Sequence, residues 1–248
     1  MQKMLGYVRK ACQEFDMIAD GDRIAVGVSG GKDSLVLLSA LAGFRRFSEH
    51  PFELVAVTID PQFGGVPGDY APAAALCERL GIEYDLILSD IGPIVFDIRK
   101  EPNPCSLCAK LRRGALHDAA KAHGCNKIAL GHHFDDVVET FIMNLFREGR
   151  VGCFAPVTYL SRKDLTMIRP LVFAPEQQVQ SCAKRNGLVT VKSKCPADKT
   201  TVREQTKQWL AEMERADKGF KLRLFGALRR SGVNGWGIPA ENEREEGS

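Results

Sequence analysis

The sequence lacks any long apolar run, and this absence limits the kinds of protein that it can encode. No stretch of its 248 residues reaches the roughly 20 apolar residues that a membrane-spanning helix needs. The first residues, Met1 to Tyr7, contain no apolar segment of the kind found in a signal peptide. Internal repeats are missing as well. We therefore expect a cytoplasmic enzyme without a membrane partner.

A large excess of charge is also missing. Lys and Arg number 34 against 31 Asp and Glu, which gives a formal net charge of +3. This mildly basic balance is compatible with a nucleic-acid partner but does not by itself indicate one. The apolar content of 44% and the charged content of 26% are ordinary for a globular protein. The length fits one large domain, or a core domain with an extension.

The segment 23–38 is the stretch around which the rest of the chain is organised. Its apolar residues 24–28 predict a short buried strand, Ser-Gly-Gly-Lys-Asp-Ser follows at 29–34, and leucines then recur at helical intervals. A strand, a glycine turn and a helix in this order place backbone N–H groups and a helix N-terminus at one point, which favours anions. Gly30 and Gly31 allow a phosphate to approach the backbone closely.

The other side chains of this loop suit a phosphate site as well. Ser29 and Ser34 offer hydroxyl donors, Lys32 offers a cation, and Asp33 can hold a metal ion on the phosphates. A Walker A loop counted from Gly27 needs its second glycine at position 32, where this chain has lysine. A glycine-rich turn that binds nothing is the other alternative. The coincidence of six suitable residues favours phosphate binding.

Strands and helices alternate along the chain. Beyond the first strand, the pattern predicts strands at 53–59, 83–88, 127–130, 165–172 and 188–192, and helices at 1–20, 34–47, 73–80, 105–123, 135–149, 175–186 and 200–230, the last interrupted near Gly219. This alternation predicts an α/β fold with a doubly wound parallel sheet. Ligands bind beyond the carboxyl ends of such strands, so the segments 29–34, 58–60 and 131–136 are expected to meet.

The segment 131–136, Gly-His-His-Phe-Asp-Asp, leaves its strand at that same edge. Two histidines and two carboxylates at the start of a helix can bind magnesium or position ATP. The alternative is a helix cap with two partly exposed histidines.

Cysteines cluster at a single place. Of the eight cysteines, only Cys105 and Cys108 form a Cys-x-x-Cys pair. A helix start lowers the pKa of such thiols, and the pair alone is ambiguous between zinc, redox and iron–sulfur use. Cys195, in a loop with basic neighbours, is the best candidate for a third ligand, and Cys125 and Cys153 remain alternatives. Three cysteines with an open fourth position suit a cubane iron–sulfur cluster.

These motifs, in this order, resemble the TtcA family of tRNA 2-thiocytidine synthetases in the PP-loop ATPase superfamily. The resemblance is carried by residues 29–34, by Cys-Ser-Leu-Cys-Ala-Lys-Leu-Arg-Arg-Gly at 105–114, by Leu-Gly-His-His-Phe-Asp-Asp at 130–136 and by Ile-Arg-Pro-Leu at 168–171. It implies a PP-loop, adenine nucleotide alpha-hydrolase-like fold with a C-terminal helical extension. We accordingly expect an N-terminal helix at 1–20, a PP-loop ATPase domain at 21–195, a helical segment at 196–235 and a disordered tail at 236–248.

The resemblance also implies a reaction, in which ATP adenylates a pyrimidine C2 oxygen and sulfur delivered through an iron–sulfur cluster replaces it. The target would be a cytidine in the anticodon loop of tRNA, and the cofactors would be ATP, Mg²⁺ and a [4Fe-4S] cluster on Cys105, Cys108 and Cys195. Catalytic roles fall to Lys32, Asp33, Cys105 and Cys108. The implied contacts to ATP and magnesium are Ser29, Gly30, Gly31, Lys32, Asp33, Ser34, His132 and Asp136, and the sheet rule adds Thr58 and Gly131.

The expected partners are tRNA and a sulfur donor, either a cysteine desulfurase or sulfide, and we expect a homodimer. Candidate tRNA contacts are Lys110, Arg112, Arg113, Lys184, Arg185, Lys192, Lys194, Lys199, Arg223, Arg229 and Arg230. Two other functions remain open. One is a PP-loop enzyme that amidates or sulfurates a small molecule, and the other is a non-catalytic module that senses nucleotide or redox state.

Overall fold

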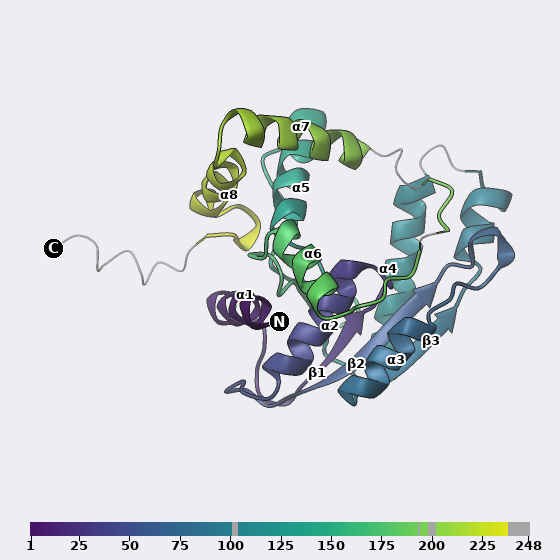
Figure 1. Cartoon of the computed structure of the whole chain (residues 1–248). Helices are drawn as coiled ribbons and strands as arrows, with labels where there is room; N and C mark the ends of the chain where they lie inside the picture. Colours follow the sequence, from purple (N-terminus) through teal and green to yellow (C-terminus); the bar gives the residue numbers. More distant parts are fainter. Residues whose placement is uncertain (101–103, 193, 198–201, 238–248) are drawn as a thin grey trace.

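A six-stranded sheet with helices on both faces forms the centre of the molecule (Figure 1). The computed structural model describes residues 1–100, 104–192, 194–197 and 202–237. The strands are β1 (Asp22–Gly27), β2 (Phe52–Asp60), β3 (Glu83–Leu88), β4 (Lys127–Ala129), β5 (Val157–Leu160) and β6 (Leu165–Ile168). They lie in the order β3-β2-β1-β4-β6-β5, all parallel except β5, which pairs antiparallel with β6. The predicted α/β fold with a mainly parallel sheet is confirmed.

The helices are α1 (Gln2–Glu14), α2 (Lys32–Phe44), α3 (Ala71–Leu80), α4 (Pro104–Ala122), α5 (Phe134–Arg147), α6 (Glu176–Arg185), α7 (Val202–Ala216) and α8 (Phe220–Ser231), with short turns η1 (Phe63–Gly65), η2 (Pro93–Ile98) and η3 (Val233–Gly235). Among the described residues, no helix is long and apolar enough to cross a membrane.

Alternate residues of β1 face opposite cores, as the period of a strand requires. Ile24 and Val26 pack in the core that includes α1, α2 and α6. Ala25 packs in the other core, which includes α4 and η2. The central strand is therefore buried on both faces, which explains its continuous apolar run.

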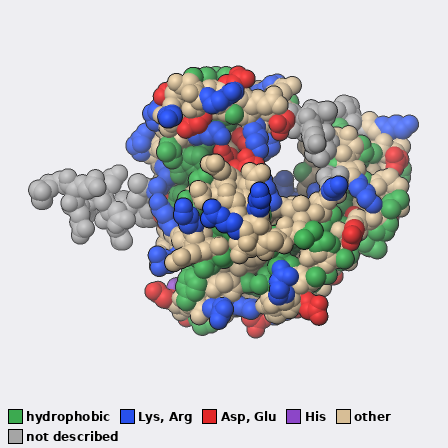
Figure 2. Space-filling model, viewed as in Figure 1, with side chains coloured by type: hydrophobic (Ala, Val, Ile, Leu, Met, Phe, Trp, Pro, Cys, Tyr) green, Lys and Arg blue, Asp and Glu red, His purple; other side chains and the backbone are tan. Residues whose placement is uncertain are grey.

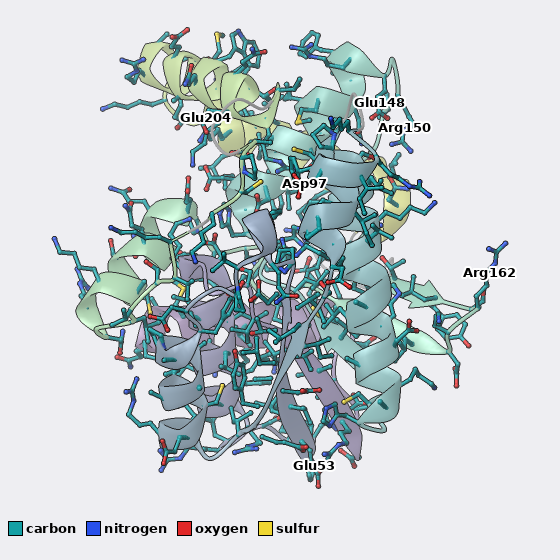
Figure 3. All side chains as sticks on the ribbon, turned by 90° about the vertical axis from the view of Figure 1, so that its right-hand side faces the viewer. Glu53, Asp97, Glu148, Arg150, Arg162 and Glu204 are labelled. Carbon is teal, nitrogen blue, oxygen red and sulfur yellow. The ribbon has the colours of Figure 1, made fainter. Side chains whose placement is uncertain are left out.

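The carboxyl ends of the central strands lie side by side. Val26 of β1 pairs with Ala56 of β2 and with Ala129 of β4. The loops that follow these strands therefore emerge at one edge of the sheet. In Figure 3, Glu53 near the start of β2 lies at the bottom of the molecule and Glu204 of α7 lies at the top, so this edge faces the C-terminal helices.

The chain continues as part of the core further than predicted. Trp236, which was expected in the disordered tail, is fully buried, and its indole N–H donates to the carbonyl of Phe154 at 2.8 Å. Its ring packs edge-on against Phe15 and Phe225. That prediction is wrong for Trp236, because an aromatic cluster between α1 and α8 holds it. The predicted tail at 238–248 lies outside the described residues.

One strand prediction is also wrong, one extends too far and one strand was missed. The segment 188–192 forms no strand in the described part of the chain, although the Val191 N–H donates to the Gly30 carbonyl at 2.9 Å. The sequence analysis missed β5, a four-residue antiparallel edge strand too short to show a clear periodicity. The strand predicted at 165–172 ends at Ile168, since Pro170 cannot extend a ladder.

Candidate functional site

The loop between β1 and α2 is held in shape by its own hydroxyl groups. The Ser29 N–H donates to Ser34 Oγ at 3.1 Å, and Ser34 Oγ donates to the Gly31 carbonyl at 2.9 Å. Gly30 has φ +77°, a conformation that favours glycine. The N-cap residue, Gly31, provides no side-chain cap to α2, so the N–H groups of its first turn remain available for an anion.

The two charged side chains of this loop are part of a wider network. Lys32 Nζ lies 3.1 Å from Asp33 Oδ1 and 3.1 Å from Glu176 Oε1 at the start of α6. Lys207 of α7 binds the same Glu176 carboxylate at 2.7 Å. Burial opposes ionisation of Glu176, but the hydrogen bonds from Lys207 and Lys32 outweigh it and lower the pKa of this carboxyl to about 2. Glu176 thus stays charged and fixes the Lys32 ammonium within the loop 29–34, which is called the phosphate loop below.

The sequence analysis missed Glu176 and Lys207. Neither belongs to a recognisable motif, and only the folded chain brings α6 and α7 to Lys32. Figure 2 shows a hollow in the molecule below α7, between α6 and α4, with acidic and basic side chains along its rim.

The β4–α5 loop packs directly on the phosphate loop. A Cβ atom added to Gly131 would lie 3.0 Å from the carbonyl carbon of Asp33, so glycine lets the two loops approach without a shift of the backbone. His133 caps α5 through two hydrogen bonds. Its ring Nδ1 accepts the backbone N–H of Asp136 at 3.3 Å, and its backbone N–H donates to Asp136 Oδ2 at 2.9 Å. His133 Nε2 lies 3.7 Å from Asp33 Oδ1. The capping histidine therefore sits between the two acids expected at the site.

The two histidines of this motif have different surroundings. His132 lies against the ring of Phe154, with centroids 4.8 Å apart. Burial, together with the nearby cations Arg169 and Arg203, lowers the pKa of His132 to about 3, so its imidazole is neutral at pH 7. Its Nδ1 atom has no hydrogen-bond partner within the described protein. His132 can therefore offer a neutral ring to a bound molecule.

The acids of the motif also connect the core to the C-terminal helices. Asp135 is buried, accepts the Glu176 N–H at 2.7 Å and binds Lys221 of α8 at 2.7 Å. Asp136 binds Arg203 of α7 at 3.3 Å. Asp135 therefore connects α5 to α6 and α8. Asp136 instead contacts His133, which in turn lies next to Asp33 of the phosphate loop.

Thr58 does not occupy the position that the sheet rule predicted. Its side chain is fully buried, and its hydroxyl donates to the Val28 carbonyl at 2.7 Å while accepting the hydroxyl of Tyr84 at 3.0 Å. The structure therefore corrects the assignment of Thr58 as a nucleotide contact. Thr58 instead ties β2 to the end of β1.

Two cavities open at the phosphate loop and share Ser29 and Arg112. The first, the Leu116 cavity, has a volume of about 330 Å³ and is lined mainly by apolar side chains of the strands and α4, with Arg113, His117 and His132. The second, the Tyr70 cavity, has a volume of about 270 Å³. Its lining comes from the phosphate loop, from the segment 60–70 and from Val191, Lys192 and Lys194. Several of the residues predicted for the site therefore line two neighbouring cavities that share Ser29 and Arg112.

Val191 brings the distant third cysteine toward this space. Besides its hydrogen bond to Gly30, Val191 lies so close that a Cβ atom on Gly30 would be 2.7 Å from the Val191 side chain. The chain then runs through Lys194, whose ammonium donates to the Pro67 carbonyl at 3.2 Å, to Cys195. Cys195 is part-buried.

The Cys-x-x-Cys pair approaches from α4. Cys108 is buried, Cys105 is exposed, and Arg112 lies one helical turn beyond Cys108 on the same face, lining both cavities. Burial raises the pKa of the Cys108 thiol and the Arg112 cation opposes this rise. The thiols of Cys195 and Cys105 raise the pKa of Cys108 further. Arg112 after Cys108 and Lys194 before Cys195 both line the Tyr70 cavity, so the two cysteine segments border one space.

In the described parts of the chain, no three His, Cys, Asp or Glu side chains stand together in the arrangement of a metal site. The alternative third ligands lie elsewhere: Cys125 is buried against α4, in the core below the sheet edge, and Cys153 is buried with its thiol donating to the Val137 carbonyl at 3.4 Å. Burial raises the pKa of Cys153 to about 12. Both therefore have the character of packed core residues.

The candidate tRNA contacts divide into two groups. Arg112, Arg113, Lys192 and Lys194 line the two cavities. Arg229 instead pairs with Glu14 at 2.5 Å between α8 and α1, and Arg223 pairs with Asp217, so these two contribute to the packing of the C-terminal helices. Lys199 lies outside the described residues.

Comparison with known proteins adds sequence and fold relatives. Residues 5–213 match a family model described as a PP-loop domain. The chain is 40% identical over 230 residues to the tRNA-cytidine(32) 2-sulfurtransferase of Geobacter sulfurreducens, covering 92% of this chain and 89% of that protein. It is 41% identical over 224 residues to the protein of the same name from Pelobacter propionicus, covering 89% and 82%.

Two solved structures have a similar fold. The U34-tRNA thiolase NcsA from Methanococcus maripaludis, solved with its [4Fe-4S] cluster, superposes with a TM-score of 0.73 at 27% identity, covering 91% of this chain and 77% of that chain. The NH3-dependent NAD synthetase from Campylobacter jejuni superposes with a TM-score of 0.50 at 15% identity, covering 92% and 90%, and shares the fold alone.

Proposed function

Because this chain belongs to the PP-loop family and, within it, to the group of the tRNA-cytidine(32) 2-sulfurtransferases, we propose that it thiolates C2 of a cytidine in tRNA with ATP as the activating substrate. The observation that carries the proposal is that the uncapped helix start at the phosphate loop and the two cysteine segments border one cavity: Ser29, Arg112 (one turn beyond Cys108) and Lys194 (next to Cys195) all line the Tyr70 cavity. An anion site and nearby thiols are what adenylation and sulfur transfer respectively require.

In the first step the C2 oxygen of the pyrimidine forms a bond to the α-phosphorus of ATP, and the bond from that phosphorus to the β-phosphate oxygen breaks. Pyrophosphate leaves, and AMP becomes attached to C2 through the former carbonyl oxygen. Lys32 and the N–H groups at the start of α2 stabilise the charge that develops on pyrophosphate. Glu176 holds Lys32 in position through their ion pair.

The adenosine of ATP fits the Leu116 cavity. This cavity combines apolar walls from β1, β2, β4 and α4 with the neutral ring of His132. It opens at Ser29, where the phosphates enter the loop. Asp33 and Asp136, joined through His133, are the carboxylates available to hold Mg²⁺ on the phosphates.

In the second step sulfur forms a bond to C2 and AMP leaves with the former oxygen. The net change converts the C2 carbonyl and ATP to a thiocarbonyl, AMP and pyrophosphate, with sulfide as the sulfur input and no change of redox state. Cys105, Cys108 and Cys195 fit a [4Fe-4S] cluster by their donor chemistry, since three thiolates leave one iron open. When bound, such a cluster supplies a place to hold the sulfur that is transferred.

The expected partners follow from this chemistry: tRNA, and a cysteine desulfurase or free sulfide as the sulfur source. The expected location is the cytoplasm, where tRNA is found. The homodimer predicted above also remains a proposal.

Parallel assays of products and of ATP binding test the proposal. Anaerobically prepared protein should release one AMP and one pyrophosphate for each sulfur placed in tRNA. Cys195→Ala should keep the wild-type Kd for ATP and lose thiolation, whereas Cys12→Ala, a change in the buried face of α1, should thiolate normally. Formation of ADP and phosphate instead of AMP would contradict adenylation. Full thiolation by Cys195→Ala would show that a persulfide carries the sulfur.

A further inference from the structure

The Tyr70 cavity has features that neither ATP nor the cysteines account for. It shares Ser29 and Arg112 with the Leu116 cavity, but its other lining residues are Gly31, residues of the segment 60–70, Val191, Lys192 and Lys194. Aromatic and basic side chains dominate its rim: Phe63, Tyr70, Lys192 and Lys194. Aromatic faces with neighbouring cations form the pattern by which proteins bind unstacked nucleotides of single-stranded RNA.

We infer that the Tyr70 cavity receives the target pyrimidine nucleotide after it leaves the stack of an RNA loop, with its base against Tyr70 and Phe63 and its backbone phosphates on Lys192 and Lys194. The inference rests on the proposed function, and it assigns the second substrate to a cavity distinct from the one that holds adenosine.

The aromatic wall is built in advance. Both oxygens of Asp60 are engaged by backbone, accepting the Gln62 N–H at 2.9 Å and the Gly68 N–H at 2.7 Å. These bonds fix the turn of the loop 62–70. Phe63 packs edge-on against Phe96 of η2, with centroids 5.6 Å apart. The backbone of the loop and the Phe63 ring are therefore held in place before a base enters the cavity.

The basic wall closes the cavity from the other side. Lys192 and Lys194 are both exposed, and the bond from Lys194 to the Pro67 carbonyl joins their segment to the aromatic loop. Arg112 adds a third cation at the boundary with the Leu116 cavity. The one carboxylate in the described lining, Asp60, accepts a backbone N–H on each oxygen, and the three cations outnumber it among the lining residues.

The lining residues decide between the two possible occupants. Phe63 and Tyr70 line the Tyr70 cavity, whereas the lining of the Leu116 cavity contains no Phe, Tyr or Trp among the residues that the structure describes. An unstacked base of single-stranded RNA is held by aromatic rings with cations nearby, which favours the Tyr70 cavity for the RNA nucleotide. In the Tyr70 cavity its C2 oxygen can approach the α-phosphate at Ser29, and Cys195 follows Lys194 directly in the chain.

The test uses RNA binding, which does not depend on thiolation. The probe is an anticodon stem-loop RNA, together with the same RNA made abasic at the target cytidine, bound to the full-length protein. Removing the base should weaken binding to wild type by about five- to 150-fold, the range expected for one stacked base. Tyr70→Ala should discriminate between the two RNAs much less than wild type, with only Phe63 left to stack on the base, while its Kd for ATP stays within about twofold of wild type.

Control variants of the same residue types separate a role in the cavity from a general effect of the substitution. Tyr159→Ala removes an exposed tyrosine on β5 and should still discriminate between the two RNAs. The double variant Lys192→Ala and Lys194→Ala should weaken both RNAs and reduce the salt dependence of binding, whereas Lys3→Ala at an exposed position on α1 should do neither. These lysines are exposed, so their variants report even if Tyr70→Ala fails to fold.

Two results would overturn the inference. If Tyr70→Ala weakens ATP binding and leaves RNA discrimination unchanged, the cavity holds adenosine. If wild type does not discriminate against the abasic RNA, no base enters the cavity. A wild-type protein that discriminates but forms no thionucleoside would instead contradict the proposed reaction and leave the assignment of the cavity in place.

Discussion

At the scale of single residues, charge and hydrogen bonding hold the phosphate loop ready before any ligand arrives. The hydroxyls of Ser29 and Ser34 fix the turn, and Glu176 fixes the Lys32 cation. Such preorganisation is effective because no energy is spent on reorientation when the reaction charge develops.

The first prediction concerns Asp33. Asp33→Ala should lower pyrophosphate release by about 100-fold or more, since the phosphate loop loses a carboxylate that is placed to hold Mg²⁺. The protein should stay folded because this side chain is not part of a core. Radiolabelled ATP turnover measures the effect, with Asp69→Ala on the exposed loop before α3 as the control. Near-normal turnover by Asp33→Ala would refute the role of this acid.

The second prediction concerns the pH dependence that Glu176 confers. Its folded-state pKa of about 2 lies below its ordinary value of 4.5, so its ion pairs stabilise the fold fully above about pH 4.5 and this stability is lost as the pH falls toward 2. Glu176→Gln should therefore cost on the order of 1–3 kcal/mol at pH 7. The difference from wild type should shrink below pH 4.5.

Urea unfolding from pH 7 to pH 3 measures this difference, and Glu148→Gln, an exposed acid at the end of α5, serves as the matched control. A constant difference between wild type and Glu176→Gln across the whole range would show that the ion pairs with Lys32 and Lys207 contribute nothing.

At the scale of elements, the site depends on how closely the loops pack on one another. Gly131 lets the β4–α5 loop contact the phosphate loop, and Gly30 lets the segment with Val191 cross it. Periodicity predicted the main strands, and with them the edge at which these loops meet. It did not predict that residues 188–192 would bind the phosphate loop instead of the sheet, because a short β-branched run looks alike in both settings.

The third prediction tests this crossing with two glycines in the same backbone conformation. Gly30 has φ +77° and Gly21 has φ +78°, but an added Cβ meets Val191 only at Gly30. Both Gly→Ala variants should lose about 1 kcal/mol of stability from backbone strain. Gly30→Ala should in addition displace the segment that carries Cys195 and lower the iron content of reconstituted protein.

Iron analysis and thermal unfolding of the two variants decide the point. Equal iron content in Gly21→Ala and Gly30→Ala would show that the crossing does not position Cys195.

At the scale of the whole molecule, the C-terminal helices are part of the site as well as of the fold. Arg203 and Lys207 of α7 and Lys221 of α8 bind Asp136, Glu176 and Asp135 respectively. The motifs at 29–34, 105–108 and 131–136 were readable from the sequence because each has its own local chemistry. These cations were not, since their partners lie 31 to 86 residues away and only tertiary packing brings them together.

The fourth prediction concerns Trp236, which secures the end of this C-terminal unit. Trp236→Ala should cost about 3–5 kcal/mol, because it removes a fully buried ring and leaves a cavity among Phe15, Phe154 and Phe225. Trp209→Ala, at a ring that is 37% exposed on α7, should cost clearly less. Urea unfolding compares the two, and an equally small loss in both would place Trp236 outside the cooperative core.

We propose that this chain places sulfur on C2 of a cytidine in tRNA at the expense of ATP. Mass spectrometry of the nucleosides of tRNA from a strain that lacks the gene, complemented with wild type or with Asp33→Ala, tests this activity most directly. We expect 2-thiocytidine to be missing from the deletion strain, to return with wild type and not to return with Asp33→Ala. Unchanged 2-thiocytidine in the deletion strain, or its full return with Asp33→Ala, would contradict it.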